Sequence, residues 1–341
     1  MSQSRRPRSE RRAEERAADS DAPAKDHQGR WTRIIIAAVV AIIVLGIAAI
    51  PLYSTYIGPF KRTIITVDGL SINIDYFLRI SKITGADPFT TLNDLSEQMI
   101  IKIEAPKYGI EVFPEDIDLE LRTIARGNSE FISESEFKEW YRQRLNQTGL
   151  SDEEYRDVIG TSLLANQFHV YLAARVPTVA EQVHLFSLFV ETQEDAAEAR
   201  ERWAAGEEFT GLVAELTLDE FSKENDGELG WFPRGVLDPQ FDYEAFNLST
   251  GNVSQPIPMF DPEVDMNSGQ EPSILGWSLF WIKERAETRE LDEESLQSMK
   301  AQALENWLVS EMSNHEIKYY GFNNGFDSET YAWINWQLAK E

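Results

Sequence analysis

The stretch GEEFTGLVAELTLDEFSKENDGELGWFPRGVLDPQFDYEAF, residues 206–246, decides the fold of the central part of this chain. Its most distinctive segment is SKENDGELGWFPRG, residues 222–235. Upstream, the apolar and β-prone run Val183–Val190 predicts a strand, and a helix is expected over residues 194–205. Pro177 precedes these elements and marks a boundary. The pattern therefore predicts a separate domain that begins just after this proline.

This stretch resembles the parvulin-type peptidyl-prolyl isomerases. Further features of that family follow in the expected order, namely Phe209, Phe241, Phe246, Gly251 and a last strand over residues 276–283. The resemblance covers roughly residues 178–288, about a third of the chain. It implies a small antiparallel sheet with surrounding helices, and hence an α+β fold class.

A prolyl isomerase must lower a rotation barrier of about 18–20 kcal/mol around an X–Pro bond, without breaking a covalent bond. An apolar pocket for the proline ring and polar groups beside the twisting amide would favour the transition state. The resemblance places Leu237 and Phe241 in that pocket, with Phe246 closing it or supporting it from behind. It places Asp219 beside the amide. The alternatives are core packing for the apolar residues and a turn or helix cap for Asp219.

Two positions depart from the family pattern. The family usually has a histidine in the first strand and another in the last, where this chain has Ser187 and Ser278. A serine hydroxyl can donate and accept hydrogen bonds, but it cannot change charge near neutral pH as imidazole can. His184 lies three residues before Ser187, on the opposite face of a regular strand, and is expected to be structural. Catalytic efficiency is therefore in doubt more than the fold.

The sequence before this module predicts a mostly helical lobe over residues 60–176. Asp68-Gly69 predicts a hairpin turn, after which Asp75 is expected to cap a helix. Further helices are expected over residues 92–108, 114–126 and 135–145, and from a Ser151–Glu154 capping box to Ala174. This order resembles the N-terminal lobe of SurA- and PrsA-like chaperone isomerases.

The C-terminal segment, residues 289–341, contains an amphipathic pattern over residues 293–317 that predicts one long helix. The resemblance implies that this helix returns to complete the chaperone lobe. The stretch that follows, KYYGFNNGFDSETYAWINWQLAKE from Lys318 onward, is dense in aromatic side chains. We expect it to pack on the lobe, with an exposed client-binding patch as the alternative.

A membrane segment is predicted near the N-terminus. IIIAAVVAIIVLGIAAIPLY, residues 34–53, has no charged residue and is long enough to match a bilayer core of about 30 Å. The alternative, a cleaved signal peptide, usually has a shorter apolar core. The arginines of residues 1–33 predict a cytoplasmic N-terminus and an extracytoplasmic ectodomain in a single-pass membrane protein. The tail of residues 1–33 is expected to be disordered.

Composition excludes several other functions. The formal net charge of −26 argues against nucleic acid as a partner. The chain has no cysteine and four histidines without metal-ligand spacing, so we predict no metal site and no cofactor. The loop over residues 260–273 carries alternating oxygen ligands. A calcium loop beginning at Asp261 would however require glycine and glutamate where Met266 and Pro272 stand.

The leading hypothesis is a membrane-anchored foldase that holds unfolded clients and isomerises X–Pro bonds, with the lipid bilayer contacted through residues 34–53. One alternative is a chaperone whose module binds proline-containing peptides without catalysis, as the loss of both histidines permits. Another is an assembly subunit of an envelope complex.

Overall fold

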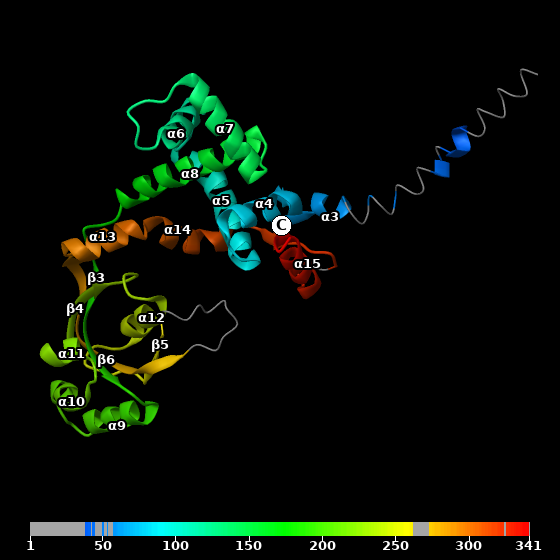
Figure 1. Ribbon diagram of the computed structural model, residues 1–341. Coiled ribbons are helices and arrows are strands. Elements are labelled where there is room, and N and C mark those ends of the chain that lie inside the picture. The colour runs from blue at the N-terminus through cyan, green and yellow to red at the C-terminus, as the bar shows by residue number, and fades with distance from the viewer. Residues whose placement is uncertain are drawn as a thin grey trace, which may run out of the picture.

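The computed structural model describes residues 38–41, 43–44, 50, 53, 57–261, 273–323 and 325–340. Helix and small antiparallel sheets are mixed, as the predicted α+β class requires. Figure 1 shows two units, a mostly helical lobe and a β-rich module joined to it at one end. Each unit has hydrophobic core clusters of its own.

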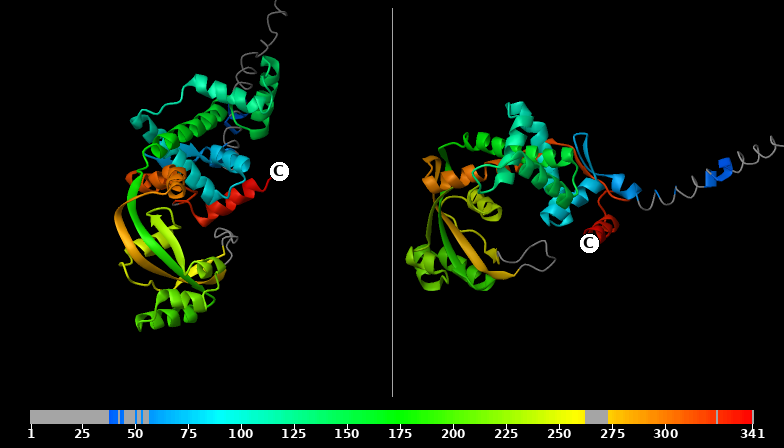
Figure 2. Two further views of the ribbon diagram at one scale, coloured as in Figure 1. Left: turned by 90° about the vertical axis from the view of Figure 1, so that its left-hand side faces the viewer. Right: turned by 45° about the horizontal axis from the view of Figure 1, so that its top comes forward.

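A three-stranded antiparallel sheet joins the two ends of the helical lobe. Its order is β2-β1-β7, with β1 over Thr63–Val67, β2 over Leu70–Asn73 and β7 over Ile317–Tyr319. The predicted Asp68-Gly69 turn connects β1 and β2, and both of its residues have positive φ. The strand β7 was not predicted from the sequence. Its pairing with β1 brings the first and last segments of the lobe into one sheet, as Figure 2 shows.

Helices build the rest of the lobe. They are α3 (Gly58–Lys61), α4 (Ile74–Thr84), α5 (Pro88–Glu104), η1 (Ala105–Tyr108), α6 (Pro114–Arg126), α7 (Glu134–Thr148) and α8 (Asp152–Ala173). The predicted capping box of Ser151 and Glu154 begins α8. The predicted cap of α4 was wrong, because Asn73 accepts the hydrogen bond from the Tyr76 amide and Asp75 lies within the first turn.

The prediction of one helix over residues 293–317 was also wrong. The segment forms α13 (Glu293–Ala301), α14 (Ala303–Glu311) and η2 (Met312–Asn314) before it enters β7, and α15 (Ser328–Leu338) follows. The apolar face is nevertheless covered as expected. Trp307 lies edge-on to Phe168 of α8, with ring centroids 4.7 Å apart, and Leu308 and Ile334 are buried in the lobe core.

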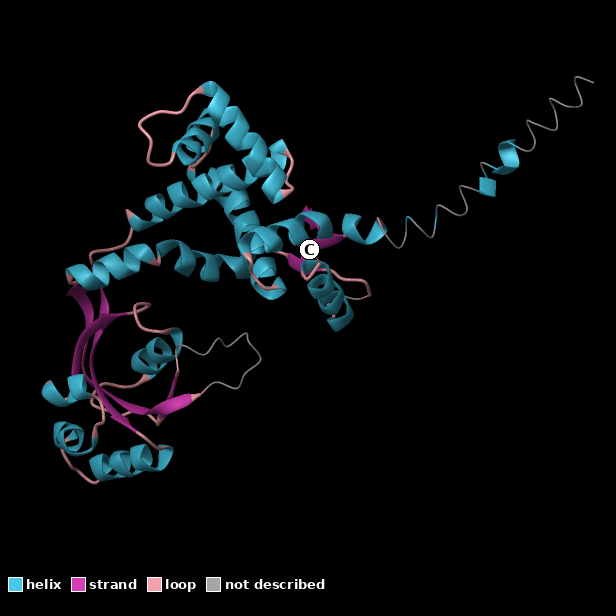
Figure 3. Ribbon diagram, viewed as in Figure 1, coloured by secondary structure: helices cyan, strands magenta, loops and turns pink. Residues whose placement is uncertain are grey.

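The module contains a four-stranded antiparallel sheet of order β4-β3-β6-β5. Its elements are β3 (Val179–Val190), α9 (Gln193–Ala204), α10 (Phe209–Leu216), α11 (Glu220–Glu224), β4 (Glu228–Pro233), α12 (Pro239–Asn247), β5 (Ile257–Phe260) and β6 (Ile274–Glu290). Helices α9 and α10 pack on one face of the sheet and α12 packs on the other, as the secondary-structure colours of Figure 3 make clear.

The two longest strands connect the module to the lobe. β3 and β6 pair along their length, from Val179 opposite Glu290 to Val190 opposite Trp277. One further hydrogen bond, from the Leu291 amide to the Thr178 carbonyl, continues this pairing to the edge of the lobe. The chain therefore enters and leaves the module at the same place.

The tail of residues 1–33 lies outside the described residues, as do twelve of the twenty residues of the predicted membrane segment, 34–53, and most of the loop over residues 260–273. Within the described part of the chain, no helix combines the length and the apolar character needed to cross a bilayer.

Candidate active site

A pocket of about 880 Å³ opens on the face of the module sheet that α12 covers. Strands β3, β5 and β6 form its floor, and α11 and α12 form its walls. Five of the six residues that the sequence assigned to the site line it, namely Asp219, Ser187, Ser278, Leu237 and Phe241. The fold thus gathers in one cavity residues that come from the beginning, the middle and the end of the module sequence.

The apolar part of the pocket is built by α12 and the loop before it. Asp238 caps α12 by accepting a hydrogen bond from the Gln240 amide, and Pro239 occupies the first turn. Phe241 then points towards the sheet, where its ring meets Phe280 of β6 edge to face, with centroids 5.5 Å apart. Leu237 lies beside them. Aromatic and aliphatic surfaces of this kind bind a proline ring through area burial.

Phe246 does not line the pocket. It is 4% exposed and belongs to the core cluster between α12 and the sheet, together with Leu185 and Phe280. The Arg234 guanidinium lies over its ring at 4.3 Å, and Arg285 donates hydrogen bonds to the Phe246 and Leu248 carbonyls at 2.9 and 3.0 Å. Of the two predicted roles, the geometry favours support from behind over closure of the pocket.

Asp219 stands at the polar wall as the cap of α11. Its Oδ2 accepts hydrogen bonds from the Ser222 amide at 2.7 Å and from the Ser222 hydroxyl at 2.5 Å. The preceding segment is fixed to β3, because the Leu218 amide donates to the Phe189 carbonyl and the Phe189 amide donates to Thr217 Oγ1. The helix-cap alternative for Asp219 is therefore observed, and the same residue also faces the pocket.

Ser187 and Ser278 lie on the pocket floor and are 7% and 3% exposed. Ser187 is opposite Phe280 and Ser278 is opposite Phe189, so the two serines are diagonal neighbours on adjacent strands. Diagonal neighbours are roughly 7–8 Å apart, which is too far for two serine side chains to bridge. Among the described residues, neither hydroxyl has a hydrogen-bond partner. The direct coupling that two histidines would provide is therefore missing.

His184 is on the other face of the sheet. Its ring stacks on Trp231 with centroids 4.9 Å apart, and its Nε2 lies 2.7 Å from Glu228 Oε1. It does not line the pocket, as the alternation along β3 predicts. His184 therefore does not replace either of the missing histidines.

Gly227, in the GELGWF motif, keeps the α11 wall close to β3. Its carbonyl accepts a hydrogen bond from the Ser187 amide at 2.8 Å, and its φ is +86°. A Cβ at this position would lie 2.8 Å from a Val213 methyl group and 3.0 Å from the Ser187 carbonyl oxygen. The position thus requires glycine for both its conformation and the close approach.

Several pocket residues were missed in the sequence. Phe280 and Leu185 lie two positions from the predicted serines on the same strand faces, so strand alternation was a signal that could have found them. Met259 and Gln240 also line the pocket and carried no such signal. Three carboxylates, Asp219, Asp238 and Asp261, give the pocket its charged groups.

One partly buried carboxyl group supports the pocket from outside. Burial raises the pKa of Asp242 in α12, while the Gly235 amide, which donates to its Oδ1 at 2.6 Å, opposes this effect. The hydrogen bond ties the end of the GELGWFPRG segment to α12. It therefore fixes the loop that presents Leu237.

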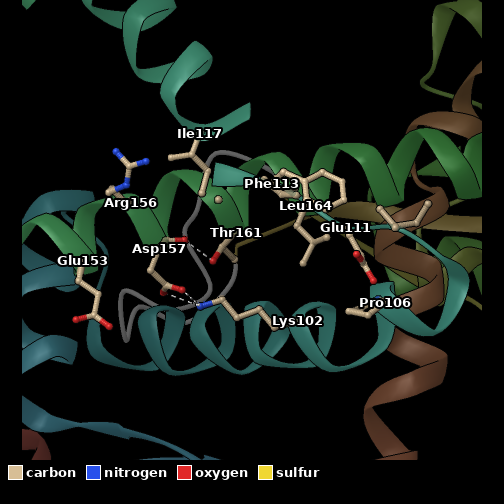
Figure 4. A pocket seen from close by; sticks show the side chains of 13 residues that line it. Lys102, Pro106, Glu111, Phe113, Ile117, Glu153, Arg156, Asp157, Thr161 and Leu164 are labelled. Atoms are coloured by element: carbon tan, nitrogen blue, oxygen red, sulfur yellow. Dashed lines mark hydrogen bonds and ion pairs between the residues drawn. The ribbon is translucent and has the colours of Figure 1, made fainter. Parts of the chain in front are cut away.

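A second cavity of about 560 Å³ lies in the helical lobe, between α5, α6 and α8, and is drawn in Figure 4. Phe113, Ile117 and Leu164 form an apolar side, and the Lys102 ammonium lies 2.6 Å from an Asp157 oxygen on the other side. Phe113 is 57% exposed. This cavity offers apolar contact area to an extended chain and is separate from the module pocket.

Comparison with known proteins agrees with the geometry of the module. The Rotamase family profile, described as PPIC-type PPIASE domain, matches residues 189–266. The Foldase protein PrsA of Oceanobacillus iheyensis is 27% identical over 172 residues, 47% of this chain and 54% of that protein. The Parvulin-like PPIase of Rickettsia conorii is 34% identical over 80 residues, 23% of this chain and 28% of that protein.

Among solved structures, the peptidylprolyl isomerase PrsA from Bacillus cereus matches with a TM-score of 0.35 and 16% identity, over 82% of this chain and 91% of that chain. This chain spans between 51% and 62% of the length of three PrsA relatives. The predicted similarity to parvulin-type isomerases and PrsA-like foldases is confirmed by the family profile and the sequence relatives.

Proposed function

We propose that this chain, which contains a parvulin-type isomerase domain and is related to PrsA foldases, catalyses cis/trans isomerisation of X–Pro bonds in unfolded polypeptide clients. The observation that carries the proposal is the joint lining of one pocket by Leu237, Phe241 and Asp219. Spontaneous isomerisation takes tens to hundreds of seconds, slow enough to limit folding.

The proposed mechanism needs no covalent intermediate. Leu237, Phe241 and Phe280 hold the proline ring, so that rotation occurs about a bond that is fixed on one side. The Asp219 carboxylate stands beside the amide, whose charge distribution changes as resonance is lost in the twisted state. Ser187 and Ser278 contribute hydroxyl groups to the same floor. A charge that interacts more favourably with the twisted amide than with the planar one lowers the barrier.

Holding of clients is assigned to the helical lobe. The apolar side of the α5–α6–α8 cavity and the exposed Phe113 beside it suit an extended apolar segment. We place the boundaries of the helical lobe, the isomerase module and the C-terminal segment at residues 60–176, 178–288 and 289–341. We further propose that residues 34–53 anchor the chain in a membrane, with the ectodomain outside the cytoplasm.

A crossed pair of variants tests both activities in the full chain, purified in mild detergent. Leu237→Ala/Phe241→Ala should lower kcat/KM for a proline-containing peptide by about 100-fold or more, because roughly 1.5–3 kcal/mol is lost per buried side chain and about 1.4 kcal/mol is a factor of ten. It should still suppress aggregation of an unfolded client. Phe113→Ser, which places a good capping residue before α6, should lose the holding activity and keep the isomerase activity. Loss of both activities in either variant would contradict the assignment of isomerisation to the module and of client holding to the helical lobe.

A second candidate function is peptide binding without catalysis. It is favoured by the two pocket serines, which cannot ionise near neutral pH and do not bridge each other. A folded sample that binds a proline-containing peptide, with affinity lost in Leu237→Ala/Phe241→Ala, but does not accelerate isomerisation would establish this function instead.

A further inference from the structure

We propose that the helical lobe contains a Zn²⁺ site formed by His315, Glu104 and Glu311, which joins the C-terminal segment to the first helices of the lobe. One ligand atom from each of the three residues lies within 4.8 Å of the other two. His315 Nε2 is 3.4 Å from Glu104 Oε1 and 3.7 Å from Glu311 Oε1. Two ligands bound at about 2.0–2.1 Å in a tetrahedral site are roughly 3.3 Å apart, so only small movements are needed.

The buried imidazole is the observation that points to a ligand. The His315 side chain is 4% exposed, and its Nε2 is a buried nitrogen without a hydrogen-bond partner among the described residues. Leaving such a group unpaired is costly, so it needs an explanation. Nε2 is aimed at the two carboxylates without hydrogen-bond geometry. A cation held between the three atoms would satisfy them together.

The second nitrogen of the ring is already oriented for metal binding. His315 Nδ1 lies 2.7 Å from Asp68 Oδ2, and the other Asp68 oxygen accepts a hydrogen bond from the Glu316 amide at 2.8 Å. When Nδ1–H donates to this carboxylate, the lone pair of the neutral ring is on Nε2. This carboxylate–histidine arrangement recurs in zinc sites, where it fixes the tautomer and the orientation of the ring.

The charges of the cluster also favour a divalent cation. Asp68, Glu104 and Glu311 are three carboxylates, whereas Lys107, whose ammonium lies 2.5 Å from Glu104 Oε1, is a single cation among them. The three carboxylates therefore outnumber the ammonium group. The Lys107 side chain is 61% exposed and can move into solvent when a metal ion takes its place. One imidazole and two carboxylates suit Zn²⁺ with a fourth position open for water.

Fold topology brings these ligands together. Glu104 ends α5 and Asp68 is in the β1–β2 turn, whereas Glu311 ends α14 and His315 lies just before β7. The whole isomerase module separates Glu104 from Glu311 in the sequence, so no spacing motif could have revealed the site. Bound Zn²⁺ would crosslink the two ends of the lobe and stabilise its folded state.

The test measures Zn²⁺ binding by calorimetry to the untagged full chain in detergent, after EDTA treatment and dialysis, with millimolar Mg²⁺ present to suppress weak surface binding. One saturable site is expected. Glu311→Gln and His315→Gln should each weaken it at least tenfold. Glu305→Gln on the same helix and His169→Gln should leave it unchanged. Saturating Zn²⁺ should raise the Tm of the wild type and not that of His315→Gln.

Lys107→Met removes the competing ammonium and should bind Zn²⁺ several-fold more tightly. Equal affinity in this variant would contradict the assignment of Glu104 as a ligand. The proposal as a whole is overturned by the absence of a saturable site. It is also overturned by Zn²⁺ binding that survives unchanged in Glu311→Gln, a partly exposed position whose amide preserves shape and should fold.

Discussion

Asp219 has two roles that a single alanine substitution cannot separate, because it caps α11 and also supplies a carboxylate to the pocket. Asparagine is as good a helix cap as aspartate, so it removes the charge and keeps the cap. This distinction lets the chemistry of one residue be measured apart from its contribution to stability.

Asp219→Asn is expected to lower kcat/KM for peptide isomerisation by roughly tenfold or more, with little change in the free energy of unfolding. Peptide turnover and chemical denaturation measure the two quantities. The matched control is Asp292→Asn, the cap of α13 outside the pocket, which should leave turnover unchanged. Unchanged turnover in Asp219→Asn would show that Asp219 serves only as a helix cap and that its charge does not contribute to isomerisation.

Phe241 and Phe246 are both on α12 but lie in different environments. Phe246→Ala should destabilise the module by about 3–5 kcal/mol, because it leaves a cavity in the core. Phe241→Ala, at the partly buried pocket wall, should cost less stability and more kcat/KM. Denaturation midpoints and peptide kinetics compare the pair. The reverse ranking of the two stabilities would place Phe246 in the pocket.

At the residue scale, the sequence located five side chains that do line one pocket, because the resemblance preserved their spacing around the GELGWF motif. It could not decide whether Phe246 lines or supports the pocket, since both positions are apolar. It also gave no hint of the His315 cluster, whose members meet only through the pairing of β7 with β1.

At the element scale, the tight packing between the α11 segment and β3 depends on a glycine whose neighbours leave no room for a side chain. Gly227 and Gly230 both have positive φ, at +86° and +105°. Around Gly230 a Cβ would meet nothing within 4 Å, whereas around Gly227 it would collide with Val213 and the Ser187 carbonyl. Alanine variants at the two positions therefore distinguish the cost of backbone strain from the cost of steric overlap.

Gly230→Ala should cost about 1–2 kcal/mol of stability, the strain of a left-handed conformation. Gly227→Ala should cost about 1–3 kcal/mol more, because overpacking is added to the same strain. It should also lower peptide turnover, since the wall that carries Asp219 must shift. Urea denaturation of both variants measures the difference. Equal destabilisation of the two variants would show that Val213 and the Ser187 carbonyl can move away from the added methyl group without a cost in stability.

The elements themselves were largely predictable from local signals. The helix Pro114–Arg126 and the Ser151 capping box were placed correctly because proline and capping residues act over a single turn. The prediction of one long helix over residues 293–317 was wrong, because the apolar periodicity continues across the break at Gln302 and hides it. The strand β7 forms by pairing with β1, a contact distant in the sequence that a local pattern does not reveal.

At the scale of the whole molecule, three aspartates that cap helices in different parts of the chain should all lose their stabilising contribution as the pH falls. Hydrogen bonds from Thr90, from the Ser295 amide and from Thr330 lower the pKa of Asp87, Asp292 and Asp327, respectively. Their stabilising contribution is complete above the unfolded pKa of about 4 and is lost as pH falls through the lower folded values.

The free energy of unfolding should therefore fall as the pH is lowered from about 5 to about 3. Denaturation at fixed ionic strength across this range measures the slope. Asp292→Asn/Asp327→Asn keeps the caps but removes two titrating groups, so its slope should be shallower than that of the wild type. Identical slopes would mean that these caps do not drive the acid response.

The pairing of β1 with β7 also fixes an order of events during synthesis. β1 and β2 are complete at Asn73, but the strand that completes their sheet begins only at Ile317. Because ribosomes add about 5–20 residues per second, the interval between the two events is on the order of tens of seconds. The whole isomerase module emerges within this interval. A nascent chain therefore carries its isomerase before its own chaperone lobe can close.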